Sequence, residues 1–137
     1  MKNIKAFVIL SGILFACAGC NSCNKQKKET IKIGAIVFQT GDAAEYGVWV
    51  KNGLEMAKDE INTNGGINGQ QVELFYEDDN TNPKTAVTVF NKLMTTQNIP
   101  IVIAGVTSKS AMALAPNAEA KKVVLFSPCS FSDSMHF

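Results

Sequence analysis

Four short apolar runs alternate with three amphipathic stretches from Ile31 to Phe126, and this alternation is the feature that most constrains the fold. The first run, Ile31 to Phe38, begins as an alternating pattern and becomes continuously apolar, as strands do in the middle of a parallel sheet. Because each strand is joined to the next through a helical pattern with short connections, the expected order is βαβαβαβ with right-handed crossovers. We therefore predict an α/β fold in which helices cover both faces of a parallel sheet.

The remaining elements follow from periodicity and turn residues. Apolar residues three and four apart form three helical stripes. The first, in a helix from Gly47 to about Asn64, is Val50, Leu54, Ala57 and Ile61. The second is Ala86 or Val87, Phe90, Leu93 and Met94, and the third is Ala111, Leu114, Ala115 and Ala118. The further strands are expected at Gln71–Glu77, Ile99–Ala104 and Val123–Phe126. Gly65-Gly66 should end the first helix, since glycine accepts a left-handed cap, and Asn82-Pro83 should start the second.

A polar connection, Thr40–Gly47, joins the first strand to the first helix. Chain that leaves the carboxyl end of a strand forms one wall of the crevice where open α/β sheets bind ligands. The connection carries Asp42 and Tyr46, and its glycines permit tight turns. Because Gly105–Ser110 and Ser127–Phe131 follow later strands in the same way, we expect the ligand groups to collect at this one edge.

The N-terminus has the composition of a secretory leader, with charge from Lys2 and Lys5 followed by a short apolar run that ends near Ala16. The run is too short to span a bilayer, which takes roughly 20 apolar residues. The segment Leu14–Cys20 resembles the lipobox of bacterial lipoproteins, in which a cysteine becomes the lipidated first residue. We therefore expect export and a lipid anchor to the cell membrane, with the protein facing the periplasm or the cell exterior.

Two cysteines compete for the lipidated position. Cys17 has leucine three places before it and alanine just before it, whereas Cys20 follows the more usual Ala-Gly but has cysteine at the third place. We favour Cys17, which makes residues 1–16 the signal peptide; with Cys20 the signal peptide would end at residue 19. Residues 17–30 then form a polar tether, and the folded domain occupies residues 31–137.

Metal, catalytic and nucleic-acid functions find little support in the sequence. Cys17, Cys20 and Cys23 are spaced like metal ligands, but a zinc or iron–sulfur site needs a fourth ligand, and Cys129 lies far away in sequence. A nucleophilic Cys129 would need a histidine, and nothing orients His136 near the chain end. A net charge of +1 does not suggest a basic face for nucleic acid. We predict no metal, no cofactor and no catalytic residue.

Several motifs together carry a family resemblance. They are Ile33–Ile36, Gly41–Gly47, Asp59–Asn62 with Gly65–Gly69, Glu77–Asp79 with Asn82–Lys84, and Ser127–Pro128. In this order they resemble the leucine/isoleucine/valine-type periplasmic binding proteins, which are substrate-binding components of ABC transporters for branched-chain amino acids, amides and related compounds. The match runs from Ile31 to about Ser132 and is most specific in the block Asp59–Pro83. It implies the first lobe of a type I, two-lobe fold, with a transporter permease as partner.

The resemblance also implies which residues bind the ligand. Tyr46 resembles the pocket-lining tyrosine after the first strand, and Ser108 resembles the serine whose hydroxyl and amide meet the ligand carboxylate. A helix N-terminus favours an anion whatever the family. The segment Cys129–Phe131 resembles the one where a backbone carbonyl receives the ammonium group. The implied ligand-binding residues are therefore Tyr46, Ser108, Cys129 and Phe131.

The sequence departs from the family in two ways. Cys129 and Phe131 stand where a small residue and a threonine are usual, and without the threonine hydroxyl a carboxylate loses one hydrogen bond, worth about 0.5–1.5 kcal/mol. The sequence also stops at Phe137, where the family continues into a second lobe, so we expect an N-terminal lobe only, from a truncated copy. Because side-chain specificity in the family lies largely in that second lobe, the choice among amino acids and amides is left open.

Simpler explanations exist for each residue. Tyr46 could pack on the next helix, Ser108 could be an N-cap, and Trp49 and the methionines are expected to be packing residues. Asp78-Asp79 resembles the acid that holds ribose in dinucleotide folds, but the first loop has no G-x-G-x-x-G, so cap or loop contacts suffice. The alternative function is a lipoprotein hydrolase or a ligand-sensing regulatory domain on a similar sheet, since fold alone does not decide function.

Overall fold

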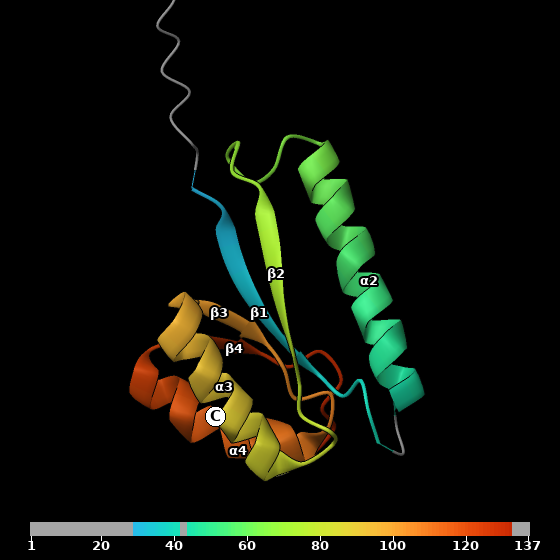
Figure 1. Ribbon diagram of the computed structural model, residues 1–137, viewed down its shortest axis with the longest axis vertical. Helices are drawn as coiled ribbons and strands as arrows, with labels where there is room; N and C mark the ends of the chain where they lie inside the picture. Colours follow the sequence, from blue (N-terminus) through green and yellow to red (C-terminus); the bar gives the residue numbers. More distant parts are fainter. Residues whose placement is uncertain (1–28, 42–43, 133–137) are drawn as a thin grey trace, which may run out of the picture.

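The computed structural model describes residues 29–41 and 44–132 and confirms the predicted βαβαβαβ order (Figure 1). The elements are β1 (Ile31–Val37), α2 (Ala44–Thr63), β2 (Val72–Asp78), α3 (Pro83–Gln97), β3 (Ile101–Ile103), α4 (Ser108–Lys121) and β4 (Val124–Phe126). No described helix is long and apolar enough to cross a membrane. The predicted signal peptide and the two candidate lipidation cysteines, Cys17 and Cys20, lie outside the described residues.

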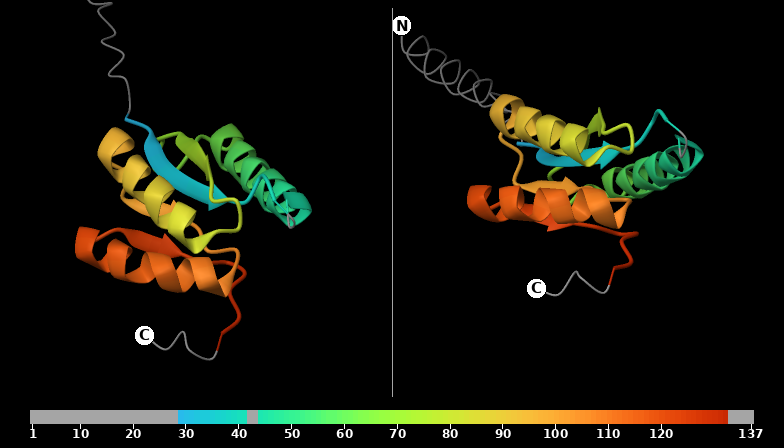
Figure 2. Two further views of the ribbon diagram at one scale, coloured as in Figure 1. Left: turned by 60° about the horizontal axis from the view of Figure 1, so that its bottom comes forward. Right: turned by 90° about the horizontal axis from the view of Figure 1, so that it is seen from below.

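The four strands form one parallel sheet in the order β2-β1-β3-β4. The chain steps from β1 to β2 in one direction and then crosses back over β1 to β3, so right-handed crossovers place α2 on one face and α3 and α4 on the other. Figure 2 shows α3 and α4 side by side, with α2 apart from them. The predicted fold class is confirmed, and the reversal between β1 and β3 is the topological switch point of the sheet.

The main core lies between the sheet and the α3–α4 layer. Its buried members are Ile36, Ala86, Phe90, Leu93, Ile99, Val102, Ala104, Leu114 and Ala118. The stripes predicted for α3 and α4 are thus confirmed at Phe90, Leu93, Leu114 and Ala118, whereas Ala115 is only half-buried. This layer therefore fixes the position of α4, whose first turn borders the candidate site.

The α2 face is covered much less completely. Among the described elements α2 contacts only β1 and β2, and its predicted stripe is half-buried except at Ala57, which is exposed. The prediction that Ala57 is buried is wrong. Because α2 packs on only two strands, a narrower stripe of its surface is covered than in a helix that has neighbours on both sides. Over the other half of this face, Val124 is 61% and Phe126 58% exposed. No described element packs on these two side chains from this side.

The helix boundaries follow the expected local signals with small shifts. After α2, Gly65 and Gly66 adopt φ of 95° and 78°, which confirms the predicted glycine stop. Asn82 caps α3, since its side chain accepts hydrogen bonds from two first-turn amides, and Pro83 is the first helical residue. The α2 helix starts at Ala44, before the predicted Gly47, so its first turn lies inside the polar connection.

Candidate functional site

The chain segments that leave β1, β3 and β4 meet at the carboxyl edge of the sheet, as the sequence predicts. β1 and β3 are neighbours, and β4 is the neighbour of β3, so the three exits are adjacent. All strands are parallel, which places the three exits on the same edge. In Figure 1 the arrows of β1 and β2 run down toward this edge.

Two of the predicted site residues lie in direct contact. The amide of Phe131 donates a hydrogen bond of 3.0 Å to Oγ of Ser108, which is the first residue of α4. The Ser108 hydroxyl proton is therefore still available to a ligand. The Phe131 side chain is 90% exposed, so its backbone amide is the group that faces Ser108. The contact joins the N-terminus of α4 to the segment that follows β4.

The alternative explanation for Ser108, that it serves only as an N-cap, is wrong. Thr107 is the N-cap of α4, and its Oγ1 accepts a hydrogen bond of 3.3 Å from the amide of Ser110. The amides of Ser108 and Lys109 belong to the first turn, where a helix offers no internal acceptor. The first turn therefore presents two backbone donors and the Ser108 hydroxyl to an anion.

A pair of serines holds the segment after β4 in place. The hydroxyls of Ser127 and Ser130 donate to the carbonyl oxygen of Gly105 at 2.7 and 2.6 Å. Gly105 has φ of +73°, and a Cβ there would lie 2.7 Å from that of Ala111. Cys129 is a half-buried free thiol between the two serines. Ser130 lies inside the predicted segment Cys129–Phe131, but no role of its own was predicted for its hydroxyl.

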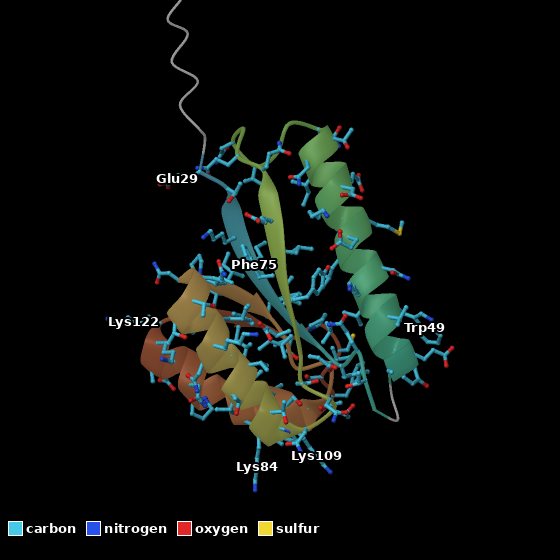
Figure 3. The ribbon with its side chains drawn as sticks, in the orientation of Figure 1. Glu29, Trp49, Phe75, Lys84, Lys109 and Lys122 are labelled. Carbon is cyan, nitrogen blue, oxygen red and sulfur yellow. The ribbon has the colours of Figure 1, made fainter. Side chains whose placement is uncertain are left out.

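Tyr46 stands apart from the Ser108–Phe131 pair. It is exposed in the first turn of α2, and its ring meets that of Trp49 edge-on, with centroids 5.1 Å apart and an interplanar angle of 75°. Figure 3 shows Trp49 pointing outward from α2. The expectation that Trp49 packs inside is therefore wrong, because α2 turns this side chain to solvent, and Met56 and Met112 are exposed as well. The contact between Tyr46 and Trp49 agrees with the simpler explanation for Tyr46, that it packs on the helix that follows the first strand.

Gly47 determines where Tyr46 lies. It is the buried residue of α2, and a Cβ at this position would lie 1.7 Å from the carbonyl oxygen of Phe38. Only a residue without a side chain allows the first turn of α2 to approach the end of β1 so closely. Tyr46, the preceding residue, is thereby held at the carboxyl edge.

Of the acidic pair at the end of β2, Asp78 makes the expected loop contacts, whereas Asp79 also contacts Ser110 in α4. Asp78 accepts hydrogen bonds from the amides of Gln39 and Asn80, both at 2.9 Å, and from the Thr40 hydroxyl at 2.6 Å. Burial raises the pKa of Asp78, but these hydrogen bonds together outweigh it and bring the pKa below its usual value. Asp79 is 2% exposed, and burial raises the pKa of its carboxyl.

Two cavities lined by described residues lie away from this site. Cavities of about 690 and 550 Å³ open near Pro100, at the amino edge of the sheet. Neither is lined by Tyr46, Ser108, Cys129 or Phe131. Within residues 29–41 and 44–132 no cluster of His, Cys, Asp or Glu is suited to a metal ion. In the described part of the chain, the groups that contact one another at the site, Ser108 and the Phe131 amide, form a wall along the sheet edge.

Known proteins are similar to this chain in sequence and in fold. The family described as periplasmic binding protein matches residues 30–136. The Leu/Ile/Val-binding protein BraC3 of Rhizobium johnstonii is 40% identical over 98 residues, which cover 72% of this chain and 26% of that protein. The Leu/Ile/Val-binding protein of Escherichia coli is 31% identical over 126 residues, which cover 92% of this chain and 33% of that protein.

A solved structure agrees with these relatives. It is the branched-chain amino acid transporter substrate binding protein LivJ from Streptococcus pneumoniae, in complex with isoleucine. It superposes with a TM-score of 0.73 at 35% sequence identity. The matched part is 77% of this chain and 30% of the LivJ chain. The chain thus spans about a quarter to a third of the length of these relatives. By sequence and by fold, the chain belongs to the periplasmic binding protein family.

Proposed function

We propose that this chain is the first lobe of a substrate-binding protein that captures branched-chain amino acids, or related small aliphatic amino acids or amides, for an ABC transporter permease. The relatives that support this proposal are named for binding leucine, isoleucine and valine. The single observation that carries it is the contact between the Phe131 amide and Ser108 Oγ, because it gathers donors for a carboxylate at one helix N-terminus.

The geometry suggests how the ligand is held. The carboxylate accepts hydrogen bonds from the Ser108 hydroxyl and from the free amides of the first turn of α4. The Phe131 amide, which donates to Ser108 in the free chain, turns its hydrogen bond to the ligand. The backbone carbonyl of Cys129 receives the ammonium group, and the ring of Tyr46 supplies an apolar wall.

We further propose capture without turnover. A hydrolase would need a base that takes the proton of a nucleophile such as Ser108. The group bonded to Ser108 is a backbone N–H, which donates a hydrogen and cannot accept one. No described contact favours the alternative of a hydrolase or a regulatory domain. The expected readout is binding of an amino acid that is recovered unchanged.

Affinity should be modest for this chain alone. In the family, binding uses both lobes and closure excludes water, whereas this chain spans 30% of its isoleucine-bound relative. If a complete protein binds at about 1 μM, or −8.2 kcal/mol, half of that free energy corresponds to about 1 mM. We expect isothermal titration calorimetry with isoleucine, leucine and valine to give dissociation constants of about 1 mM or weaker.

Matched variants locate the binding. Ser108→Ala should abolish measurable binding, since it removes a hydroxyl from the carboxylate site. Phe131→Thr should strengthen binding by about 2- to 10-fold, because it adds a hydroxyl worth roughly 0.5–1.5 kcal/mol. Thr96→Ala, on the exposed side of α3, should change nothing. A dissociation constant in the micromolar range for the chain alone, or unaltered binding by Ser108→Ala, would overturn the proposal.

We also propose that the protein is exported and anchored by a lipid at Cys17, or alternatively at Cys20, after removal of residues 1–16 or 1–19. The charged, apolar and small-residue succession at the N-terminus supports this. When the full chain is expressed in a bacterial host, labelled palmitate should enter it. The Cys17→Ala and Cys20→Ala double variant should carry no label, and the single variants identify the cysteine. Label that persists in the double variant would contradict the anchor.

A further inference from the structure

The two carboxylates that close β2 turn to different parts of the site. Asp78 accepts hydrogen bonds from the Gln39 amide and the Thr40 hydroxyl, both on the segment that leaves β1 toward Tyr46. Asp79 accepts a hydrogen bond of 3.1 Å from the hydroxyl of Ser110, in the first turn of α4. Asp78 therefore contacts the segment after β1, and Asp79 contacts the first turn of α4; we place both segments in the ligand site.

The contact between Asp79 and Ser110 is closed off from water. Asp79 is 2% and Ser110 1% exposed, and the second carboxylate oxygen of Asp79 accepts from the Thr81 amide at 3.3 Å. A buried carboxylate that lost its donors would be strongly unfavourable. The buried side of the first turn of α4 is therefore hydrogen-bonded to the end of β2, 31 residues earlier in the chain.

The tie extends to the N-cap of α4. Thr107 Oγ1 lies 3.2 Å from Ser110 Oγ and accepts the Ser110 amide, so Asp79, Ser110 and Thr107 form one chain of hydrogen bonds. In sequence, Ser108 lies between Thr107 and Ser110, two members of that chain of hydrogen bonds. A shift of Ser110 would move the cap and, with it, the hydroxyl and amides that we assign to the carboxylate.

No cation competes for Asp79. The charged residues on the neighbouring elements are Asp78 on β2, Lys84 in the first turn of α3 and Lys109 in the first turn of α4. Asp78 accepts its hydrogen bonds from the segment that follows β1. Figure 3 shows both lysines extending away from the body of the protein. None of the ion pairs among the described residues involves Asp79. Its contribution is the directional bond to Ser110.

We propose that Asp79 is a positioning residue, which fixes the first turn of α4 and so orients Ser108 for the ligand carboxylate. The inference rests on the proposed function for its link to ligand, whereas the structural part stands on the Asp79–Ser110 contact alone. The two parts therefore call for separate measurements.

Amide hydrogen exchange on the full 137-residue chain without ligand tests the structural part. Asp79→Ala should speed exchange of the Ser110 and Ala111 amides by roughly 5- to 100-fold, the range expected for loss of a buried hydrogen bond. Asp79→Asn should restore slow exchange, because its side-chain amide can donate to the Ser110 hydroxyl. Should Asp79→Ala fail to fold, Ser110→Ala removes the same bond and should speed exchange at Ala111.

Asp78→Ala is the matched control, since it removes a carboxylate from the adjacent position. It should speed exchange of the Gln39 amide, which donates to Asp78, and leave the Ser110 and Ala111 amides unchanged. If Asp79→Ala and Asp78→Ala speed the same amides alike, or if Asp79→Ala leaves Ser110 and Ala111 slow, the positioning role is wrong.

Calorimetry with L-isoleucine tests the link to ligand. Asp79→Ala should weaken binding at least about 5-fold relative to the unmodified chain, with Asp79→Asn within about 2-fold of it. Equal binding by Asp79→Ala and the unmodified chain would overturn the link. If the unmodified chain binds no isoleucine while the exchange pattern appears as expected, the proposed function fails and the structural tie stands.

Discussion

Gly47→Ala is expected to destabilise the chain by about 3 kcal/mol or more, toward the upper end of what overpacking costs. The added Cβ would lie 1.7 Å from the carbonyl oxygen of Phe38 and would also meet the carbonyl carbon, at 2.7 Å. Both are backbone atoms of the segment that follows β1, so no side-chain rotation relieves the clash. Either α2 moves away from the sheet, or the end of β1 is distorted. Urea denaturation followed by circular dichroism measures the loss.

Gly53→Ala provides the matched control in the same helix. A Cβ at Gly53 has no atom within 4 Å, and alanine is a better helix former than glycine by about 0.8–1 kcal/mol. This variant should therefore stabilise the chain, with a sign opposite to that of Gly47→Ala. Destabilisation of similar size by both variants, or an unaltered stability for Gly47→Ala, would contradict the close approach of α2 to β1.

Phe90→Ala is expected to cost about 3–5 kcal/mol of unfolding free energy. Phe90 has 0% exposure in the core between the sheet and the α3–α4 layer, so its truncation loses apolar burial and leaves a cavity. Since that layer fixes α4, the variant should also weaken protection of the first turn of α4. Thermal and urea unfolding measure the first effect, and amide exchange measures the second.

Phe131→Ala is the control for the same chemical change at an exposed position. Phe131 is 90% exposed, so removal of its ring should change stability by no more than about 0.5 kcal/mol. Its backbone amide, which donates to Ser108, is retained. A large loss of stability from Phe131→Ala would show that the ring packs on the body of the protein and would contradict the exposed position.

Much of the fold could be predicted from sequence because the strands and helices obey local rules. Continuous apolar runs such as Ile31 to Phe38 fit a strand inside a parallel sheet, and the Asn82-Pro83 signal fits a helix start. The stripe through Phe90 and Leu93 faces the core because α3 packs on the sheet and beside α4. Where an element has neighbours on both sides, periodicity alone identifies its buried face.

Periodicity failed where the packing partner is sparse. On α2 it placed Ala57 in the buried stripe, and Trp49 was expected to be a packing residue. Both are exposed, since α2 contacts only β1 and β2. A helical stripe shows which side chains share a face of the helix. How much of that face is buried depends on segments far away in sequence that pack against it.

For the candidate site, the sequence predicted which backbone segments meet but not the contacts between distant side chains. Sequence order indicates that the segments after β1, β3 and β4 share an edge, and the contact between Ser108 and Phe131 agrees with that. The bond from Ser110 to Asp79 joins residues 31 apart, and no local pattern encodes it. Ser110 lies four residues before Leu114 and therefore on the same face of α4, but the predicted stripe counted only apolar residues, so the burial of this serine was not expected.

The central claim is that the carboxyl edge of this sheet holds the carboxylate of an aliphatic amino acid, and an amide-by-amide magnetic-resonance titration of the isotope-labelled chain with L-isoleucine tests it most directly. We expect saturable shifts at Ser108, Lys109 and Phe131, with a dissociation constant of about 1 mM or weaker, and their disappearance in Ser108→Ala. Shifts confined to the opposite edge, around Gln70 and Asn98, or saturation in the micromolar range, would contradict the account.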